Sequence, residues 1–160
     1  MQINIEEREA KAKALFAQGY NCSQAVFLAY ADCFDLDPTL AATIAAPFGG
    51  GMGRMREVCG AVSGMALIAG LKYPMTDPKD REAKNKNYEL VKNAGTAFEQ
   101  TFGSMICREL LDIRKGTQPE IGTDGHPVVK PGKCSCSQIV QTAARIIGEK
   151  LNQSPETPQR

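Results

Sequence analysis

The sequence lacks the residues on which several common enzyme classes depend. Its only histidine, His126, falls in a stretch with neither helical nor strand periodicity, so we expect a solvent-facing turn residue and find no support for a Ser-His-Asp triad. No Gly-x-x-x-x-Gly-Lys-Ser/Thr motif is present, and the glycine run at 49–53 does not follow a strand pattern. A phosphate-binding loop and a dinucleotide site are therefore not indicated.

Charge and hydropathy exclude two further classes. The 19 Lys and Arg residues nearly balance the 18 Asp and Glu residues, which leaves a net charge of +1 and no field to attract nucleic acid or anionic membranes. The best apolar run, 62–71, is interrupted by Ser63, Gly64 and Gly70 and is far shorter than a membrane span. Residues 1–10 lack the apolar core of a secretory signal. We expect a cytoplasmic protein with no nucleic-acid partner and no membrane insertion.

Apolar residues recur at helical spacing along most of the chain, and no stretch shows convincing strand alternation. Helix start and stop signals include Asn21, the pair Asp37-Pro38 and Gly103. The pattern predicts helices at residues 5–18, 21–33, 37–46, 55–70, 77–103, 105–113 and 136–151. We therefore predict an all-α bundle of about six or seven helices. We assign it to one domain, residues 1–153, with a long loop at 114–133 and a frayed polar tail at 154–160.

A glycine-rich turn precedes the helix that we expect at the centre of the bundle. Glycine permits positive φ, so such a turn can direct several N–H groups into one small space and favour negative charge there. The residues expected to form this cradle for a cofactor are Gly49, Gly50, Gly51, Gly53, Arg54 and Gly60. Gly60 and Gly64 also leave a flat strip on one helix face, where another helix or a cofactor can approach closely.

Cys59 lies near the start of this central helix. The helix dipole and free N–H groups at that position favour a thiolate over a thiol, and Arg54 and Arg56 would add to the effect. The competing interpretation is a buried, inert core cysteine, a common situation for free cysteines.

Four of the six cysteines fall within about one turn of a predicted helix start: Cys22, Cys59, Cys107 and Cys136. Two of them open nearly identical pentapeptides, Cys-Ser-Gln-Ala-Val and Cys-Ser-Gln-Ile-Val. A helical bundle that brings these starts together would make one pocket of thiolates. Such a pocket suits thiol–disulfide exchange or an iron–sulfur cluster. Structural zinc is less well supported, since its ligands normally come in pairs two to four residues apart and the one close pair, Cys134 and Cys136, does not fit.

These residues resemble the C_GCAxxG_C_C family, whose members are described as redox-active. The resemblance covers about residues 20–151 and rests on Cys22, the motif Glu-Val-Cys-Gly-Ala-Val-Ser-Gly at 57–64, Cys107 and the final Cys-Ser-Gln-Ile-Val. It implies a small helical protein with four redox cysteines, often encoded near transporter genes. These map to Cys22, Cys59, Cys107 and Cys136. Whether Cys134 replaces or pairs with Cys136 stays open, as does the role of Cys33.

We therefore expect a redox-active protein, an oxidoreductase or electron carrier with an unidentified redox partner. Its four-cysteine site would hold an iron–sulfur cluster, the leading cofactor candidate, or form a reversible disulfide. The alternative is a non-catalytic metal-binding or transporter-associated binding module. A homodimer is also expected, because the Gly60/Gly64 face and the stripe of Phe98 and Phe102 suit packing between subunits.

Overall fold

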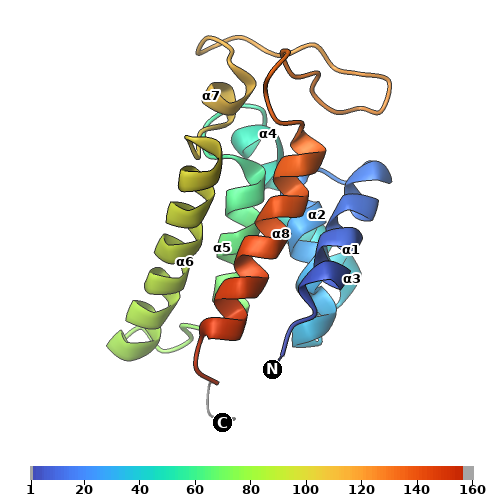
Figure 1. The fold of residues 1–160 in the computed structure, drawn as a ribbon. Coiled ribbons are helices and arrows are strands. Elements are labelled where there is room, and N and C mark those ends of the chain that lie inside the picture. Colours follow the sequence, from blue (N-terminus) through green and yellow to red (C-terminus); the bar gives the residue numbers. More distant parts are fainter. Residues whose placement is uncertain (1, 157–160) are drawn as a thin grey trace.

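The structure, a computed structural model, describes residues 2–156, and α-helices account for most of them (Figure 1). The helices are α1 (Ile5–Ala17), α2 (Cys22–Ala31), α3 (Pro38–Ala45), α5 (Gly60–Lys72), α6 (Arg81–Phe102), α7 (Cys107–Leu111) and α8 (Cys136–Gln153). Two short 3-10 turns, η1 (Asp32–Phe34) and η2 (Ala46–Phe48), follow α2 and α3. The segment α4 (Gly49–Met52) has unusual backbone angles. The prediction of an all-α bundle is confirmed; the tail residues 157–160 lie outside the described part.

Local signals explain most helix boundaries. Asn21 caps α2, and Asp37 caps α3 with proline at its first position, as predicted. Gly103 ends α6 in the left-handed conformation. The predicted start of α6 is wrong: Asp77 bonds the Lys79 N–H in a local turn, and the helix begins after Asp80, whose carboxylate accepts the Ala83 N–H at 3.0 Å.

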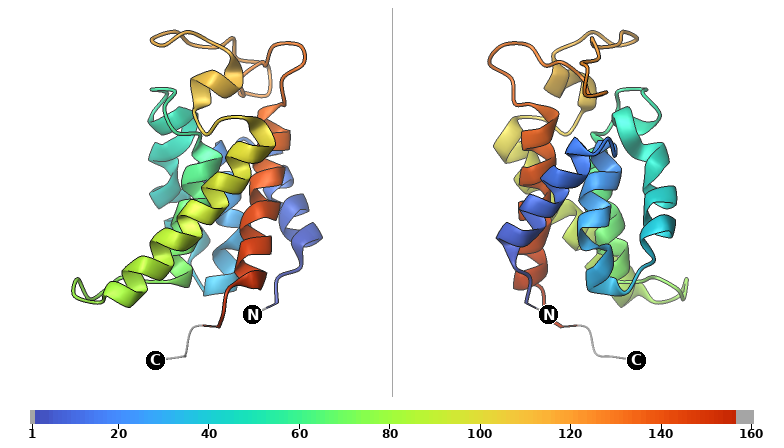
Figure 2. Two further views of the ribbon diagram at one scale, coloured as in Figure 1. Left: turned by 60° about the vertical axis from the view of Figure 1, so that its left-hand side comes forward. Right: turned by 90° about the vertical axis from the view of Figure 1, so that its right-hand side faces the viewer.

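Helices α2, α5 and α8 form the middle of the bundle, with α1 and α3 on one side and α6 on the other (Figures 1 and 2). All three run in the same direction, so their N-terminal ends share one end of the molecule with α4, α7 and the 114–133 loop. The positive ends of three helix dipoles therefore lie at that end. In the described part of the chain, no helix is long and apolar enough to cross a membrane.

The core between these helices combines large apolar side chains with small residues that allow close approach. The largest fully buried side chains are Tyr30, Phe98, Met65, Ile68, Ile147, Val26 and Val140. The Tyr30 hydroxyl donates to the Ala144 carbonyl at 2.6 Å, which satisfies the one polar atom of that ring. A Cβ on Gly64 would lie 2.9 Å from Cβ of Val26, so α2 and α5 pack closely at this glycine.

This packing bears on two predictions. The Gly60/Gly64 strip and Phe98 pack inside the chain, so they are not free for a second subunit, and a homodimer stays a prediction. The three- and four-residue spacing of apolar residues from Tyr88 onwards also predicts one buried stripe on α6, but Tyr88 is 56% exposed. It lies in the polar first half of the helix, next to Lys84.

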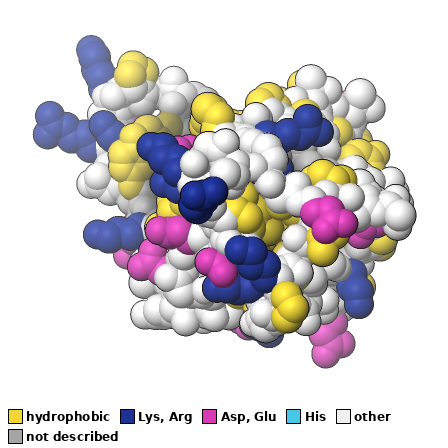
Figure 3. All heavy atoms as spheres, turned by 90° about the horizontal axis from the view of Figure 1, so that it is seen from above, with side chains coloured by type: hydrophobic (Ala, Val, Ile, Leu, Met, Phe, Trp, Pro, Cys, Tyr) yellow, Lys and Arg dark blue, Asp and Glu magenta, His cyan; other side chains and the backbone are white. Residues whose placement is uncertain are grey.

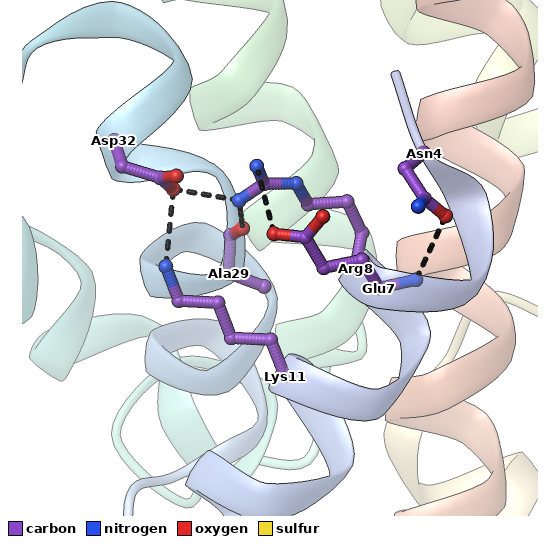
Figure 4. A network of polar contacts seen from close by, with 6 residues as sticks. All are labelled: Asn4, Glu7, Arg8, Lys11, Ala29 and Asp32. Carbon is purple, nitrogen blue, oxygen red and sulfur yellow. Dashed lines mark hydrogen bonds and ion pairs between the residues drawn. The ribbon is translucent and has the colours of Figure 1, made fainter.

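A buried arginine joins α1 to the end of α2 (Figure 4). The Arg8 guanidinium donates to the Ala29 carbonyl at 2.8 Å and pairs with Asp32 at 2.7 Å, and Lys11 reaches the same carboxylate. A cation at the C-terminal end of a helix interacts favourably with its dipole. Cys33 lies in this region, where burial raises the pKa of its thiol and the neighbouring Arg8 opposes the rise.

Candidate functional site

A cavity of about 390 Å³ lies at the end of the bundle where α2, α5 and α8 begin, and four of the six cysteines line it. Backbone and polar groups come from the turn after α3 and from the arginines that follow it. Apolar walls come from α1, α7, α8 and the long loop. The cysteines are Cys22, Cys59, Cys107 and Cys136. The structure thus brings together the four cysteines that the sequence singled out.

Each Cys-Ser-Gln repeat lies in a capping box, formed by the residue before the cysteine and by the glutamine. At the start of α2, Asn21 accepts the Gln24 N–H and the Gln24 side chain accepts the Asn21 N–H, and Ser135 and Gln138 form the same box at α8. In both cases the box places a cysteine at the first helical residue, facing the common end of the bundle. Cys107 is likewise the first residue of α7, and Cys59 is the N-cap of α5.

Backbone pairing joins the segment that leads into α5 to the segment that leads into α7. Val58 and Ile106 form an antiparallel bridge, and the Cys59 N–H donates to the Met105 carbonyl at 2.8 Å. The Cys107 N–H donates in turn to the Glu57 carbonyl at 2.6 Å. This long-range pairing holds the starts of α5 and α7 together. Periodicity did not indicate it, because a single bridge leaves no strand pattern.

The glycine-rich turn is left-handed. Five consecutive residues, Gly50 to Arg54, have φ between 57° and 68°. This conformation costs roughly 1–2 kcal/mol for each residue with a side chain, so Met52 and Arg54 are strained there. Gly49 differs from the prediction: its φ is −64°, and it is small because a Cβ would lie 2.3 Å from Nδ2 of Asn21. Strained backbone of this kind is concentrated at functional sites.

Two glycines make room for sulfur-bearing side chains. A Cβ on Gly60 would lie 2.3 Å from Sγ of Cys22 and 2.9 Å from the Phe48 carbonyl oxygen. A Cβ on Gly51 would lie 2.7 Å from Cβ of Cys107. The start of α5 and the left-handed turn can therefore approach the cysteines only because both positions are glycine.

The prediction that the helix starts make these cysteines thiolates is wrong, because desolvation in the cavity outweighs the helix ends. Burial raises the pKa of the Cys22 thiol, although N–H groups of Gly50 and Gly60 oppose it. Burial and the neighbouring sulfurs raise the pKa of Cys59 well above its ordinary value and that of Cys136 to about 12. Burial also raises the pKa of Cys107, against an opposing hydrogen bond from an arginine. A cation among the sulfurs would reverse this balance by displacing their protons.

That arginine is Arg56. Its side chain is 5% exposed, one terminal nitrogen lies 3.8 Å from Sγ of Cys107, and Nε donates to the Gln118 side chain at 2.8 Å. Gln118 also donates to the Arg54 carbonyl at 2.9 Å, which fixes the long loop to the glycine-rich turn. The sequence suggested Arg56 only as a neighbour of Cys59 and gave no sign that it would be buried.

The 114–133 loop covers the cavity. A bridge between Ile121 and Pro127 folds part of it into a hairpin, and His126 stacks on Phe16 with 3.5 Å between ring centroids. The His126 ring nitrogen Nε2 lies 2.6 Å from the Phe16 carbonyl oxygen. The prediction of a solvent-facing histidine is therefore wrong; its partner lies 110 residues away, which no local pattern indicates. Seen from above, hydrophobic side chains lie in a hollow beside Lys and Arg side chains (Figure 3).

The predicted cofactor cradle is largely placed at the cavity. The members that line it are Gly49, Gly50, Gly53, Arg54 and Gly60, whereas Gly51 packs behind Cys107. Cys134 is exposed and Cys33 lies by Arg8, so neither lines the cavity. Residues that sequence reasoning did not assign to the site include Asn21, Phe16, Leu110, His126 and Ile139.

The donor set fits a thiolate-bound cofactor better than a single ion. All six cysteines are free thiols, and within residues 2–156 no group of three or more His, Cys, Asp or Glu is arranged around one metal-ion position. In a 4Fe–4S cluster each of the four cysteines binds a different iron, so the ligands stand farther apart than those of one ion. Four cysteines, N–H groups near sulfur and apolar walls such as Leu110 and Ile139 are what an iron–sulfur cluster requires.

Comparison with known proteins gave one result. Residues 20–150 match the family model described as "Putative redox-active protein (C_GCAxxG_C_C)". No curated protein and no solved structure matched significantly.

Proposed function

Because the chain belongs to the C_GCAxxG_C_C family of redox-active proteins, we propose that its redox chemistry takes place at the four-cysteine cavity. The observation that carries the proposal is the convergence of Cys22, Cys59, Cys107 and Cys136 on one cavity from four separate helix starts. Strained backbone in the glycine-rich turn and close contacts at Gly51 and Gly60 lie against these cysteines, and strain of this kind is concentrated at functional sites.

The first form of the proposal is an iron–sulfur protein. The four cysteines would hold the cluster, and the N–H groups of Gly50 and Gly60, which already act on the Cys22 sulfur, would bond to its sulfur ligands. The loop that carries His126 would keep water from it. A bound cluster supplies one-electron transfer, so the protein would act as an electron carrier or as part of an oxidoreductase.

The second form is a reversible disulfide between two of the four cysteines that line the cavity. In this form two thiols lose two electrons and two protons to a disulfide of a partner protein, which becomes two thiols. The raised pKa values mean that one of these thiols must first lose its proton to react. A cytoplasmic location and a transporter-associated partner suit either form and remain proposals.

The deciding experiment is an assay of iron, sulfide and zinc, with an absorption spectrum, on protein purified without oxygen. For the first form we expect iron with matching sulfide and charge-transfer absorption. For the second we expect no metal and a pair of thiols that become unreactive on mild oxidation. Metal without redox activity would instead indicate a non-catalytic metal-binding module.

Matched serine variants test whether the redox chemistry takes place at the cysteines of the cavity. Cys22→Ser and Cys59→Ser should lose cluster or thiol oxidation, whereas Cys33→Ser, whose thiol lies by Arg8, should keep it. Equal behaviour of all three variants would contradict a site in the cavity.

A further inference from the structure

Arg56 is a buried cation without an acidic partner. Its exposed fraction is 5%, and its hydrogen bonds go to the neutral side chain of Gln118 and to Sγ of Cys107. No carboxylate in the described part of the chain forms an ion pair with it. The other buried arginine, Arg8, pairs with Asp32 at 2.7 Å, which is the usual way to bury a guanidinium.

The nearby carboxylates are engaged elsewhere. Glu57, the next residue, pairs with Arg108 at 2.8 Å, and Asp112 lies near Lys130. Glu109 accepts from Ser104. Asp124, on the loop above the cavity, is exposed and accepts the His126 N–H. A buried charge in this position is costly unless something else in the cavity balances it.

The backbone holds Arg56 in this position against a conformational preference. Its φ is 58°, in the region that favours glycine, yet its N–H donates to the Gly50 carbonyl at 3.1 Å. Its own carbonyl accepts from the Arg108 N–H at 3.2 Å. Gln118 then fixes the guanidinium. Strain, burial and an unbalanced charge at one residue indicate a role beyond folding.

We propose that Arg56 is the counter-charge of the four-cysteine site, and that the cavity is built for an occupant with net negative charge. Four thiolates around an iron–sulfur cluster form such an occupant, because the negative charges of the thiolates and sulfides exceed the positive charge of the iron. Gln118 positions the guanidinium beside Cys107. This inference rests on the proposed function, which it deepens by assigning the charge of the bound state.

Two substitutions isolate the charge. Arg56→Lys and Arg56→Met both lose the guanidinium hydrogen bonds, but only the lysine variant keeps the cation. In the reduced, metal-free protein, we expect the methionine variant to be at least as stable as the lysine variant in urea, because its side chain has no charge to bury. After reconstitution with iron and sulfide, we expect the lysine variant to bind the cluster at least about tenfold more tightly than the methionine variant does.

The pair Arg145→Lys and Arg145→Met is the matched control. Arg145 is exposed on α8, pairs with Glu149 and does not line the cavity, so the same exchange there should leave binding unchanged. Equal binding by the two Arg56 variants, or a metal-free methionine variant less stable than the lysine variant, would overturn the assignment. If the unsubstituted protein takes up no iron and sulfide, the cluster form of the proposed function fails and the counter-charge role fails with it. If the unsubstituted protein does take them up and the two Arg56 variants bind equally, only the inference about Arg56 fails.

Discussion

The starts of α2 and α8 share one local sequence and differ in what surrounds it. Both open with Cys-Ser-Gln and both carry the same capping box, so Cys22 and Cys136 occupy the same position of their helices. At Cys22, however, the N–H groups of Gly50 and Gly60 act on the sulfur. At Cys136, burial and the neighbouring sulfurs of Cys22 and Cys107 raise the pKa of the thiol to about 12, against an opposing effect of Arg56.

This difference distinguishes what the local sequence determines from what distant segments of the chain determine. The capping box, a local feature, decides where the helix begins and which way the cysteine faces. The chemistry of the sulfur depends on segments from elsewhere in the chain, here the left-handed turn and the start of α5. Burial therefore favours the thiol at both Cys22 and Cys136, but N–H groups offset part of this effect at Cys22.

The largest expected effect tests whether Cys136 or Cys134 completes the site. Cys136→Ser removes a thiol that lines the cavity, and Cys134→Ser removes an exposed one. If the four cavity thiolates hold an iron–sulfur cluster, losing one ligand should lower the amount of cluster bound by about tenfold or more, whereas Cys134→Ser should leave it unchanged. The iron and sulfide content after reconstitution under reducing conditions measures both variants. A larger loss for Cys134→Ser would mean that the loop rearranges to bring Cys134 in.

The next effect concerns the close contact between Gly60 and the sulfur of Cys22. Gly60→Ala places a Cβ against the Cys22 sulfur and the Phe48 carbonyl oxygen, and overpacking of this kind costs about 1–3 kcal/mol. We expect lower stability in urea and weaker metal binding together. Gly70→Ala, on the same helix with no atom within 4 Å of the new Cβ, is the control and should be stabilised by up to about 1 kcal/mol. Equal results for the two variants would show that the contact at Gly60 is unimportant.

A third prediction uses the raised pKa of Cys136. In the unfolded chain this thiol ionises near its ordinary pKa of 9.0, but in the folded protein it keeps its proton up to about 12. Above pH 9 the unfolded state therefore binds fewer protons than the folded state, and stability falls as pH rises towards 12 while staying unaffected by this group at lower pH. One pH unit inside that window should cost about 1.4 kcal/mol. Urea unfolding of the reduced protein should show that its free energy of unfolding falls more steeply between pH 9 and 12 than that of Cys136→Ser. Parallel curves for the two proteins would contradict the raised pKa.

The sequence predicts the features of the site that depend on neighbouring residues, and it misses those that depend on distant ones. Asn21, the Cys-Ser-Gln repeats and Gly103 act within a few residues, and the helices and the cysteine positions that depend on them were predicted correctly. Burial of Arg56 and the stacking of His126 on Phe16 depend on residues far apart in the chain, so no periodicity could reveal them. The thiolate prediction failed for a related reason, since helix dipoles can be read locally but desolvation cannot.

The smallest expected effect compares the two caps directly. Ser135→Ala removes one cap hydrogen bond and should cost about 1 kcal/mol. Asn21→Ala removes the equivalent bond and also the one from Nδ2 to the Ala46 carbonyl, so about 2 kcal/mol is expected. Thermal unfolding of the reduced protein measures both. Because the boxes themselves are alike, any excess for Asn21 reports its link to the turn after α3, and equal losses would mean that the turn near Cys22 is held by its own backbone rather than by the cap.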